Sequence, residues 1–266
     1  MKAPLLAATA LAALSLAGCA TVPADRMAST PPVAAAPAIP QGTGYFAADS
    51  TLPFHAPDFT KVSEADYVPA FEQGMAIQRA EVTAITANPA APNFENTIVA
   101  LENSGKLLGR VSRVFYALTG ANTTDGLDKI DEQMSPRLAA HSDAINLDPA
   151  LFARVKAVYD NRAAQSASGS MTREDARLLE RTYEEMVHAG AMLTPEQRER
   201  VKAINTELST LATQFGQKVR EATVAGAVFV TDKAQLKGMS EADIAAAAKL
   251  AAEKGKPGQW AIALQN

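Results

Sequence analysis

Three histidines are the side chains of this 266-residue chain that would first be considered for catalysis or metal binding. They are His55, His141 and His188, and none is followed four residues later by a second histidine or a carboxylate, the spacing that puts two zinc ligands on one helical face. The sequence His-Glu-x-x-His does not occur. His141, Ser142 and Asp143 contain the residue types of a catalytic triad, but neighbours on a helix point in different directions and cannot form the hydrogen-bonded relay. We therefore expect packing or surface histidines, and no catalytic or metal-binding residue in this chain.

Acidic residues form two groups that could also be mistaken for a site. Asp125, Asp128 and Asp131 lie near an expected helix start, where carboxylates are favoured by the helix dipole. A calcium loop would need oxygen ligands at alternate positions with a central glycine and a terminal glutamate, and this pattern is absent. The second group is expected to be a solvated helix face with pairs at (i, i+4) spacing: Arg177, Glu180, Arg181, Glu184 and Glu185. Nucleophile-elbow, P-loop and dinucleotide-binding patterns are also absent.

Cys19 is the only cysteine, and it stands at the end of an apolar run from Ala3 to Ala17 that follows Lys2. This run is shorter than the roughly 20 residues that a membrane-spanning helix needs, and it is typical of a cleaved signal peptide. Leu16-Ala17-Gly18-Cys19 resembles the bacterial lipobox, so we expect residues 1–18 to be removed and Cys19 to be lipidated. The alternative is an ordinary secretory signal with an incidental cysteine. Ala20 after the cysteine favours a periplasm-facing position at the outer membrane.

Residues 19–50 have the composition of a tether. Five prolines lie among small residues between Thr21 and Gly44, and proline keeps such a segment extended. We expect the folded part to start near Thr51, with a helical domain at 51–223 and the start of a small α/β element at 224–266. The 25 basic and 29 acidic residues are interspersed, which argues against nucleic acid as a partner and against a polybasic membrane-binding helix.

Apolar spacing and capping residues predict mainly α structure. Proline and small polar residues separate the segments, and Ala163 to Ser170 is expected to be a loop. Gly105 is expected to interrupt the second helix without ending it, and Pro136 to mark a kink or a join. The expected helices are Glu64–Ala87, a helix from Phe94 that reaches at least Leu118, Thr124–Ala144, a helix from Pro149, Thr172–Ala191, Thr194–Ala222 and Ser240–Glu253.

The helix that begins after Thr194 carries the longest apolar stripe. Its members are Val201, Ile204, Leu208, Leu211, Phe215 and Val219, and the helix should be about 40 Å long. After it, Ala227–Val230 and Trp260–Leu264 read as two short strands. Because two strands alone are marginal in water, we expect this β element to be incomplete.

Five runs of these helical segments, in order, resemble the bacterial peptidyl-dipeptidases of the thimet-oligopeptidase-like zinc peptidases. They are FTKVSEADYVPAFEQGM (59–75), PNFENTIVALENSGKLLGRVSRVFYALTGANT (92–123), LAAHSDAINLDPALFARVKAVYD (138–160), RLLERTYEEMVHAGAML (177–193) and INTELSTLATQFGQKVREAT (204–223). The resemblance implies the helical N-terminal lobe of a zincin-type oligopeptidase, with a channel between two lobes.

That resemblance also implies a function. Such enzymes release dipeptides from the C-termini of short peptides, using a zinc ion held by a His-Glu-x-x-His helix and a downstream glutamate. Those ligands would lie beyond Asn266, so we expect zinc in the full-length enzyme, none bound by this chain, and a chain that is inactive without the catalytic portion. The alternative is a stand-alone helical envelope lipoprotein that binds peptide or protein without catalysis.

Overall fold

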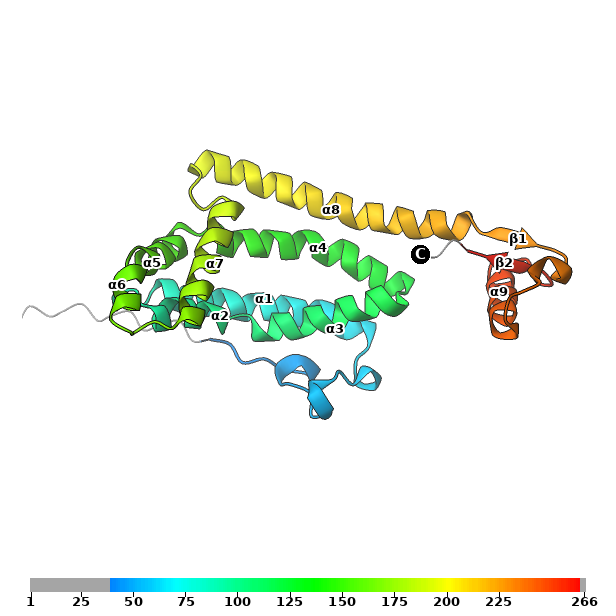
Figure 1. Cartoon of the computed structure of the whole chain (residues 1–266), viewed down its shortest axis with the longest axis horizontal. Coiled ribbons are helices and arrows are strands. Elements are labelled where there is room, and N and C mark those ends of the chain that lie inside the picture. The colour runs from blue at the N-terminus through cyan, green and yellow to red at the C-terminus, as the bar shows by residue number, and fades with distance from the viewer. Residues whose placement is uncertain (1–38, 264–266) are drawn as a thin grey trace, which may run out of the picture. The chain divides into compact units, whose positions relative to one another are not determined.

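The computed structural model describes residues 39–263, and most of them are helical (Figure 1). The α-helices are α1 (Glu64–Thr86), α2 (Ala100–Glu102), α3 (Lys106–Asn122), α4 (Asp125–Asn146), α5 (Pro149–Asp160), α6 (Arg162–Ala167), α7 (Arg173–Ala189), α8 (Pro195–Ala225) and α9 (Glu241–Glu253). Shorter turns are η1 (Tyr45–Ala47), η2 (Pro53–His55), η3 (Phe59–Lys61), η5 (Lys233–Leu236) and a π-helical turn, η4 (Phe94–Val99). The strands are β1 (Val228–Val230) and β2 (Trp260–Ile262). The prediction of a mainly α fold is confirmed, while the predicted signal peptide 1–18, Cys19 and most of the predicted tether lie outside the described residues.

Side chains cap the helices where the sequence predicted. Thr172 and Asp175 form a reciprocal capping box at the start of α7, with N–H···O distances of 2.9 and 3.1 Å. Thr194 and Gln197 do the same for α8. Each box satisfies backbone amides that have no partner within the helix, and so fixes where that helix begins. No helix in the described part of the chain is long and apolar enough to span a membrane.

Gly105 caps the start of α3, three residues after α2 ends at Glu102, which corrects the expectation of a continuous helix. Its backbone is left-handed, with φ at 69°, and helix α3 begins at the next residue. The Gly105 amide donates a hydrogen bond of 2.7 Å to the carboxylate of Glu81 on α1. A Cβ atom here would collide with the Gln78 side chain. The break thus follows from a conformation that glycine adopts at little cost and from the close approach of α1.

Two other expectations are corrected in their local detail. The segment expected to be a loop from Ala163 to Ser170 contains helix α6, because alanine, arginine and glutamine are good helix formers. The Arg162 guanidinium also lies 3.7 Å above the Tyr159 ring. Helix α4 continues through Pro136, so of the two alternatives expected there, a kink or a join of two pieces, the join is wrong.

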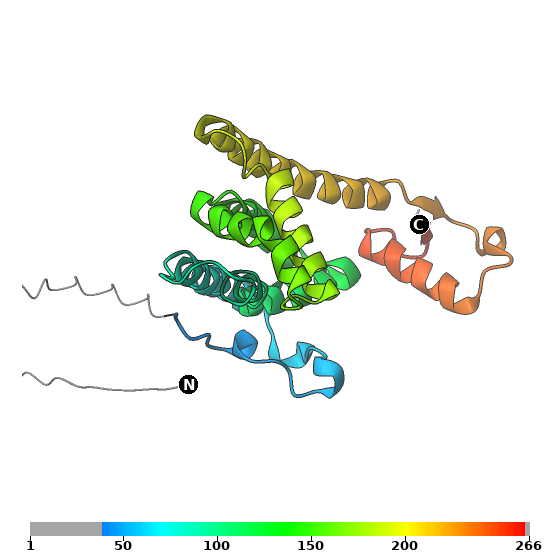
Figure 2. The same ribbon diagram turned by 60° about the vertical axis from the view of Figure 1, so that its left-hand side comes forward.

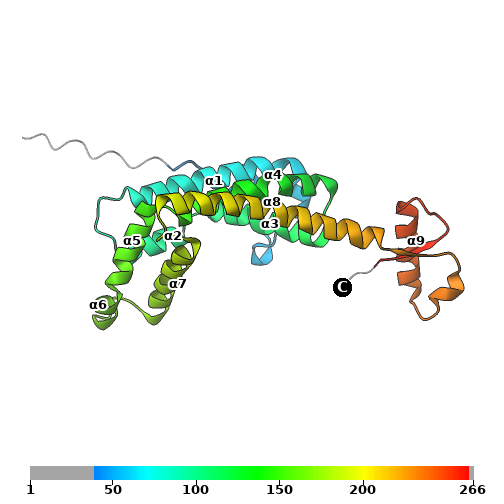
Figure 3. The ribbon, with the colours of Figure 1, turned by 90° about the horizontal axis from the view of Figure 1, so that it is seen from above.

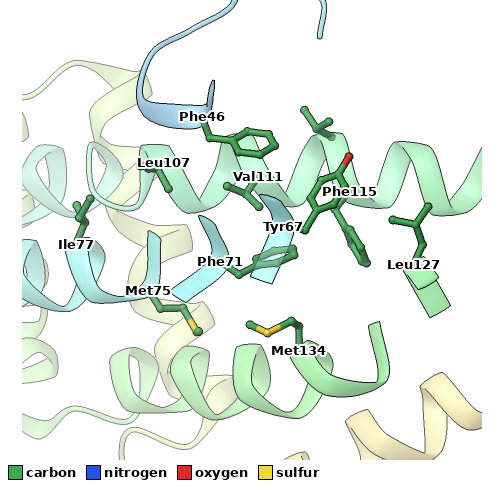
Figure 4. Packing of buried hydrophobic residues seen from close by; sticks show 11 residues of the cluster. Phe46, Tyr67, Phe71, Met75, Ile77, Leu107, Val111, Phe115, Leu127 and Met134 are labelled. Atoms are coloured by element: carbon green, nitrogen blue, oxygen red, sulfur yellow. The ribbon is translucent and has the colours of Figure 1, made fainter. Parts of the chain in front are cut away.

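Helices α1, α3 and α4 enclose the first hydrophobic core (Figure 4). The Phe115 ring of α3 lies 5.1 Å from the Tyr67 ring and 5.4 Å from the Phe71 ring, both on α1, in edge-to-face geometry. Met134 approaches the same cluster from α4. At Gly74, a Cβ atom would lie 2.8 Å from the Leu108 Cα, so the backbones of α1 and α3 pack closer than an alanine would allow.

The second core lies among α5, α7 and η4. Figure 3 shows α5 and α7 side by side and crossing the direction of α1 and α4. The fully buried side chains of this second core include Leu151, Val155 and Leu179. Buried Arg154 donates hydrogen bonds to the carbonyl oxygens of Asn88 and Ala90, and so fixes the loop before η4.

Packing begins before Thr51, earlier than the composition predicted. The Phe46 ring is 3% exposed and belongs to the first core. The Arg110 guanidinium on α3 donates to the Phe46 and Ala47 carbonyl oxygens at 2.9 Å each and to Asp49 at 3.1 Å. The proline-rich composition hid this contact because one aromatic residue and a partner 64 positions away produce it.

Residues 228–262 form a small α/β element, in agreement with the predicted strands and last helix. Strand β1 pairs antiparallel with β2, with Phe229 opposite Ala261, and α9 packs against β2. Ala251 and Ala261 are buried in this element. Small side chains of this kind allow the helix and the strand to approach closely.

Candidate functional site

His141 is a packing residue. It is buried on α4, where its Nε2 atom lies 2.8 Å from the Gln78 amide oxygen and its Nδ1 atom 3.5 Å from the Arg79 guanidinium. The arginine can only donate, so Nδ1 accepts and the ring is neutral. Burial, and then the positive charge of Arg79, lower the pKa of His141 below its ordinary value of 6.5. Both ring nitrogens are occupied, as a structural histidine requires.

The other two histidines lie apart from His141 and from each other. His55 is in η2, exposed, with its Nδ1 atom 2.9 Å from the Ser50 carbonyl oxygen. His188 lies exposed in the last turn of α7. The interpretation of all three as packing or surface residues therefore agrees with their positions.

The residues that resembled a triad diverge. His141 faces α1, whereas the buried Asp143 accepts a hydrogen bond of 2.8 Å from Asn205 on α8, and Ser142 is exposed. Successive helix positions thus serve different neighbours, as predicted.

The acidic groups also disperse. Asp128 pairs with Arg220 at 2.7 Å, and Asp131 accepts a hydrogen bond from Ser135. Arg177–Glu180 and Arg181–Glu185 are exposed ion pairs along α7. In residues 39–263, no three His, Cys, Asp or Glu side chains come together in a way that could hold a metal ion.

A hollow of about 470 Å³ lies between residues 45–57 and α3. Phe54 and His55 on its rim have φ angles of 58° and 55°, unusual for residues other than glycine, and the Phe54 side chain is fully exposed. Arg110 lines the hollow but is occupied by its three contacts with residues 46–49. The hollow contains no assembled nucleophile, base or ligand set.

The most unusual surface of the described chain is the apolar stripe of α8. Helix α4 lies between α8 and the α1–α3 pair, as Figures 1 and 2 show from two directions. The side of α8 that contacts α4 is polar and includes Asn205, Ser209 and Arg220. The apolar side chains that the sequence grouped on one face are exposed, with Phe215 at 72% and Leu208 at 58%. We define the apolar stripe by its exposed members: Ile204, Leu208, Leu211, Phe215 and Val219.

A groove of about 500 Å³ borders the apolar stripe on the side of α4. Leu211 and Phe215 line it together with Glu132 of α4 and polar residues of α8. The sequence spacing identified the stripe as one face of a long helix, but did not predict whether that face is buried. Only the structure shows that α4 is covered by the polar side of α8.

Comparison with known proteins identifies first a class of peptidases. The chain is 26% identical over 205 residues to oligopeptidase A of Salmonella typhimurium, covering 77% of this chain and 30% of that protein. No family model matches the chain.

A second group of relatives is more similar. The chain is 46% identical over 221 residues to dipeptidyl carboxypeptidase of Escherichia coli, and 44% identical over 217 residues to that of Salmonella typhimurium. These matches cover 83% and 82% of this chain. The chain therefore belongs to the peptidase family of these dipeptidyl carboxypeptidases and spans about a third of their length, 32% and 31%.

Proposed function

We propose that the chain is the N-terminal part of a zinc-dependent peptidyl-dipeptidase, which removes dipeptides from the C-termini of short peptides. The observation that carries this proposal is the 46% identity to dipeptidyl carboxypeptidase over 83% of the chain. An identity of this extent covers both hydrophobic cores rather than one motif. The helices then supply one side of the enzyme, and the catalytic groups come from the remaining length.

The residues of this chain do not fit the zinc site that the family implies. The three histidines lie on separate elements, and both nitrogens of His141 are already hydrogen-bonded. Zinc peptidases need several imidazole or carboxylate ligands around one ion. We therefore assign no catalytic step to these residues and propose that the chain is inactive by itself.

A chimera tests this function. The 221 residues of this chain that match Escherichia coli dipeptidyl carboxypeptidase would replace the corresponding part of that protein. We expect the chimera with zinc to release C-terminal dipeptides from short peptides, and the 266-residue chain to release none. A folded but inactive chimera would contradict the proposed function. Dipeptide release by the chain alone would contradict its proposed inactivity.

The alternative is a stand-alone helical lipoprotein that binds peptides without cleaving them. This alternative is supported by the two hydrophobic cores, which the described residues form without a partner chain. Calorimetric titration of the 266-residue chain with a mixture of short peptides separates the two functions. Saturable binding with intact peptides would favour the alternative, whereas no binding favours a part of a larger enzyme.

We also propose that Cys19 carries a lipid that anchors the protein in the cell envelope, facing the periplasm at the outer membrane. This proposal rests on the apolar run, the small residues before Cys19 and Ala20 after it. Mass spectrometry of a membrane extract should find an acylated N-terminal Cys19, and Cys19→Ser should abolish the modification. A mature form that begins at another residue would contradict the anchor.

A further inference from the structure

The apolar stripe of α8 differs from every other helix face of the described chain in being both continuous and uncovered. Its five members are spaced by four, three, four and four residues, so they share one side of the helix over about 22 Å. Large contiguous apolar patches on a protein surface mark sites of interaction. The stripe therefore has the properties of an interaction surface, and no described residue of the chain covers it.

Helix α8 already uses another side to contact α4. Asn205 bonds to Asp143 and Arg220 bonds to Asp128, at opposite ends of the same helix pair. These contacts fix the rotation of α8 about its axis. The stripe therefore cannot be buried against α4 without breaking both of them.

The chemistry of the missing contact follows from the charges beside the stripe. Lys218 and Glu221, which line the groove together with Leu211 and Phe215, pair with each other at 2.7 Å. These charges satisfy one another and leave no demand for an oppositely charged partner. The occupant is therefore an apolar protein surface, with a side chain that fits the groove beside Phe215.

A second copy of the chain is a poorer occupant than a larger polypeptide. Stable interfaces use about 20–30 residues and roughly 800 Å² on each partner, whereas the stripe offers five side chains. The dipeptidyl carboxypeptidases of the family have about two thirds of their length outside the match. Such a length can supply a continuous hydrophobic core across the stripe.

We infer that the apolar stripe of α8 is the surface on which the remaining two thirds of the dipeptidyl carboxypeptidase fold packs. This inference rests on the proposed function, and it adds the contact that joins the two parts. Phe215 and Leu208 are its central side chains, since they are the two most exposed members of the stripe.

The test compares Leu208→Gln/Phe215→Gln in the isolated chain and in the chimera defined above. The control is Met192→Gln, a similar change at a residue that is 65% exposed outside α8. In the isolated chain, we expect neither variant to increase the unfolded fraction at fixed urea by more than about fivefold, or to alter the monomeric mass measured by light scattering. In the chimera, we expect the double variant alone to increase the unfolded fraction about a hundredfold at fixed urea, because burial of each side chain contributes roughly tenfold or more.

Each other outcome would overturn the inference. A double variant that destabilises the isolated chain as strongly as the chimera would show that the chain covers its own stripe. A dimer that the double variant dissociates would show that a second copy does so. A chimera whose stability responds equally to the double variant and to Met192→Gln would show that the larger fold packs elsewhere.

The same samples separate this inference from the proposed function. An inactive chimera that loses stability with the double variant would contradict the proposed peptidase function and support the inference that the stripe is a docking surface. An active chimera whose stability does not respond to the double variant would support the proposed function and contradict the docking surface. If the parent chimera does not fold, co-purification of the chain with the remaining part of Escherichia coli dipeptidyl carboxypeptidase decides, and failure of the parent chain to bind would overturn the docking surface.

Discussion

The face that α1 turns toward α3 is apolar, whereas the face that α8 turns toward α4 is polar. In the first contact, Tyr67 and Phe71 are buried against Phe115. In the second, Asn205 and Arg220 make hydrogen bonds and the apolar side chains remain exposed. The difference teaches that an amphipathic pattern identifies the side of a helix to be buried, but not the neighbour that will bury it.

The largest expected effect on the free energy of unfolding is at Phe115 in the α1–α3 contact, and the same change at Phe215 of α8 provides the comparison. Phe115→Ala removes a fully buried ring from between Tyr67 and Phe71, and should lower the free energy of unfolding of the chain by about 3–5 kcal/mol. Phe215→Ala should lower it by about 0.5 kcal/mol or less, because the ring is 72% exposed. Urea denaturation measures both. Similar losses for the two variants would break the comparison between the α1–α3 and α4–α8 contacts.

A smaller effect is expected at the polar contact of α8. Asn205→Ala removes the hydrogen bond to Asp143, whose other oxygen is buried without a hydrogen-bond partner. The loss should be about 1–3 kcal/mol, since a buried acceptor without a partner is costly. Thr206→Ala, at the exposed neighbouring position, is the control in the same urea titration. Equal effects of the two variants would show that the polar face does not hold α8 against α4.

Buried His141 of α4 should also make stability depend on pH. The pKa of His141 is lowered in the folded chain, chiefly by burial, so below pH 6.5 the unfolded chain binds a proton more readily than the folded chain. Stability is therefore retained above pH 6.5 and falls as the pH decreases toward the lowered pKa. Urea midpoints at pH 7.5 and 5.0 should differ less in His141→Gln than in the parent chain. An unchanged difference would show that other groups control the pH dependence.

The smallest effect is expected at the exposed ion pairs of α7. Arg181→Ala removes a pair with Glu185 in which both side chains are more than 60% exposed. Such pairs contribute about 0–0.5 kcal/mol and are screened by salt. Urea midpoints with and without added salt should therefore be nearly identical to those of the parent. A decrease in the free energy of unfolding above about 1 kcal/mol would show that the Arg181–Glu185 ion pair stabilises the fold.

Local sequence patterns predicted most of the fold because they encode local physics. Thr172 with Asp175 and Thr194 with Gln197 satisfy backbone amides within three residues, so the starts of α7 and α8 could be read directly. The break at Gly105 depends on Gln78 and Glu81, more than twenty positions away. Contacts of this kind leave no mark in a window of neighbouring residues.

The candidate site shows the same limit. The apolar stripe of α8 could be listed from its spacing, but its exposure depends on the bonds of Asn205 and Arg220 to α4. The interpretation of the histidines as packing or surface residues came from their local spacing, whereas their separation in space is known from the structure alone. Cys19 and residues 1–18 lie outside the described residues, so the lipid anchor stays a prediction.

The hydrogen bonds that join the N-terminal segment to the helices have a mechanical consequence. If Cys19 is anchored as proposed, a pull on the N-terminal segment first reaches Thr43, which exchanges hydrogen bonds of 2.9 and 2.8 Å with Gln73 of α1, and then reaches Arg110. Three hydrogen bonds at one side chain would share that load, and the Phe46 ring would have to leave its core for the segment to peel away. The middle of α1, at Gln73, and then α3, at Arg110, would be the points at which tension from the membrane enters the folded body, rather than the start of α1.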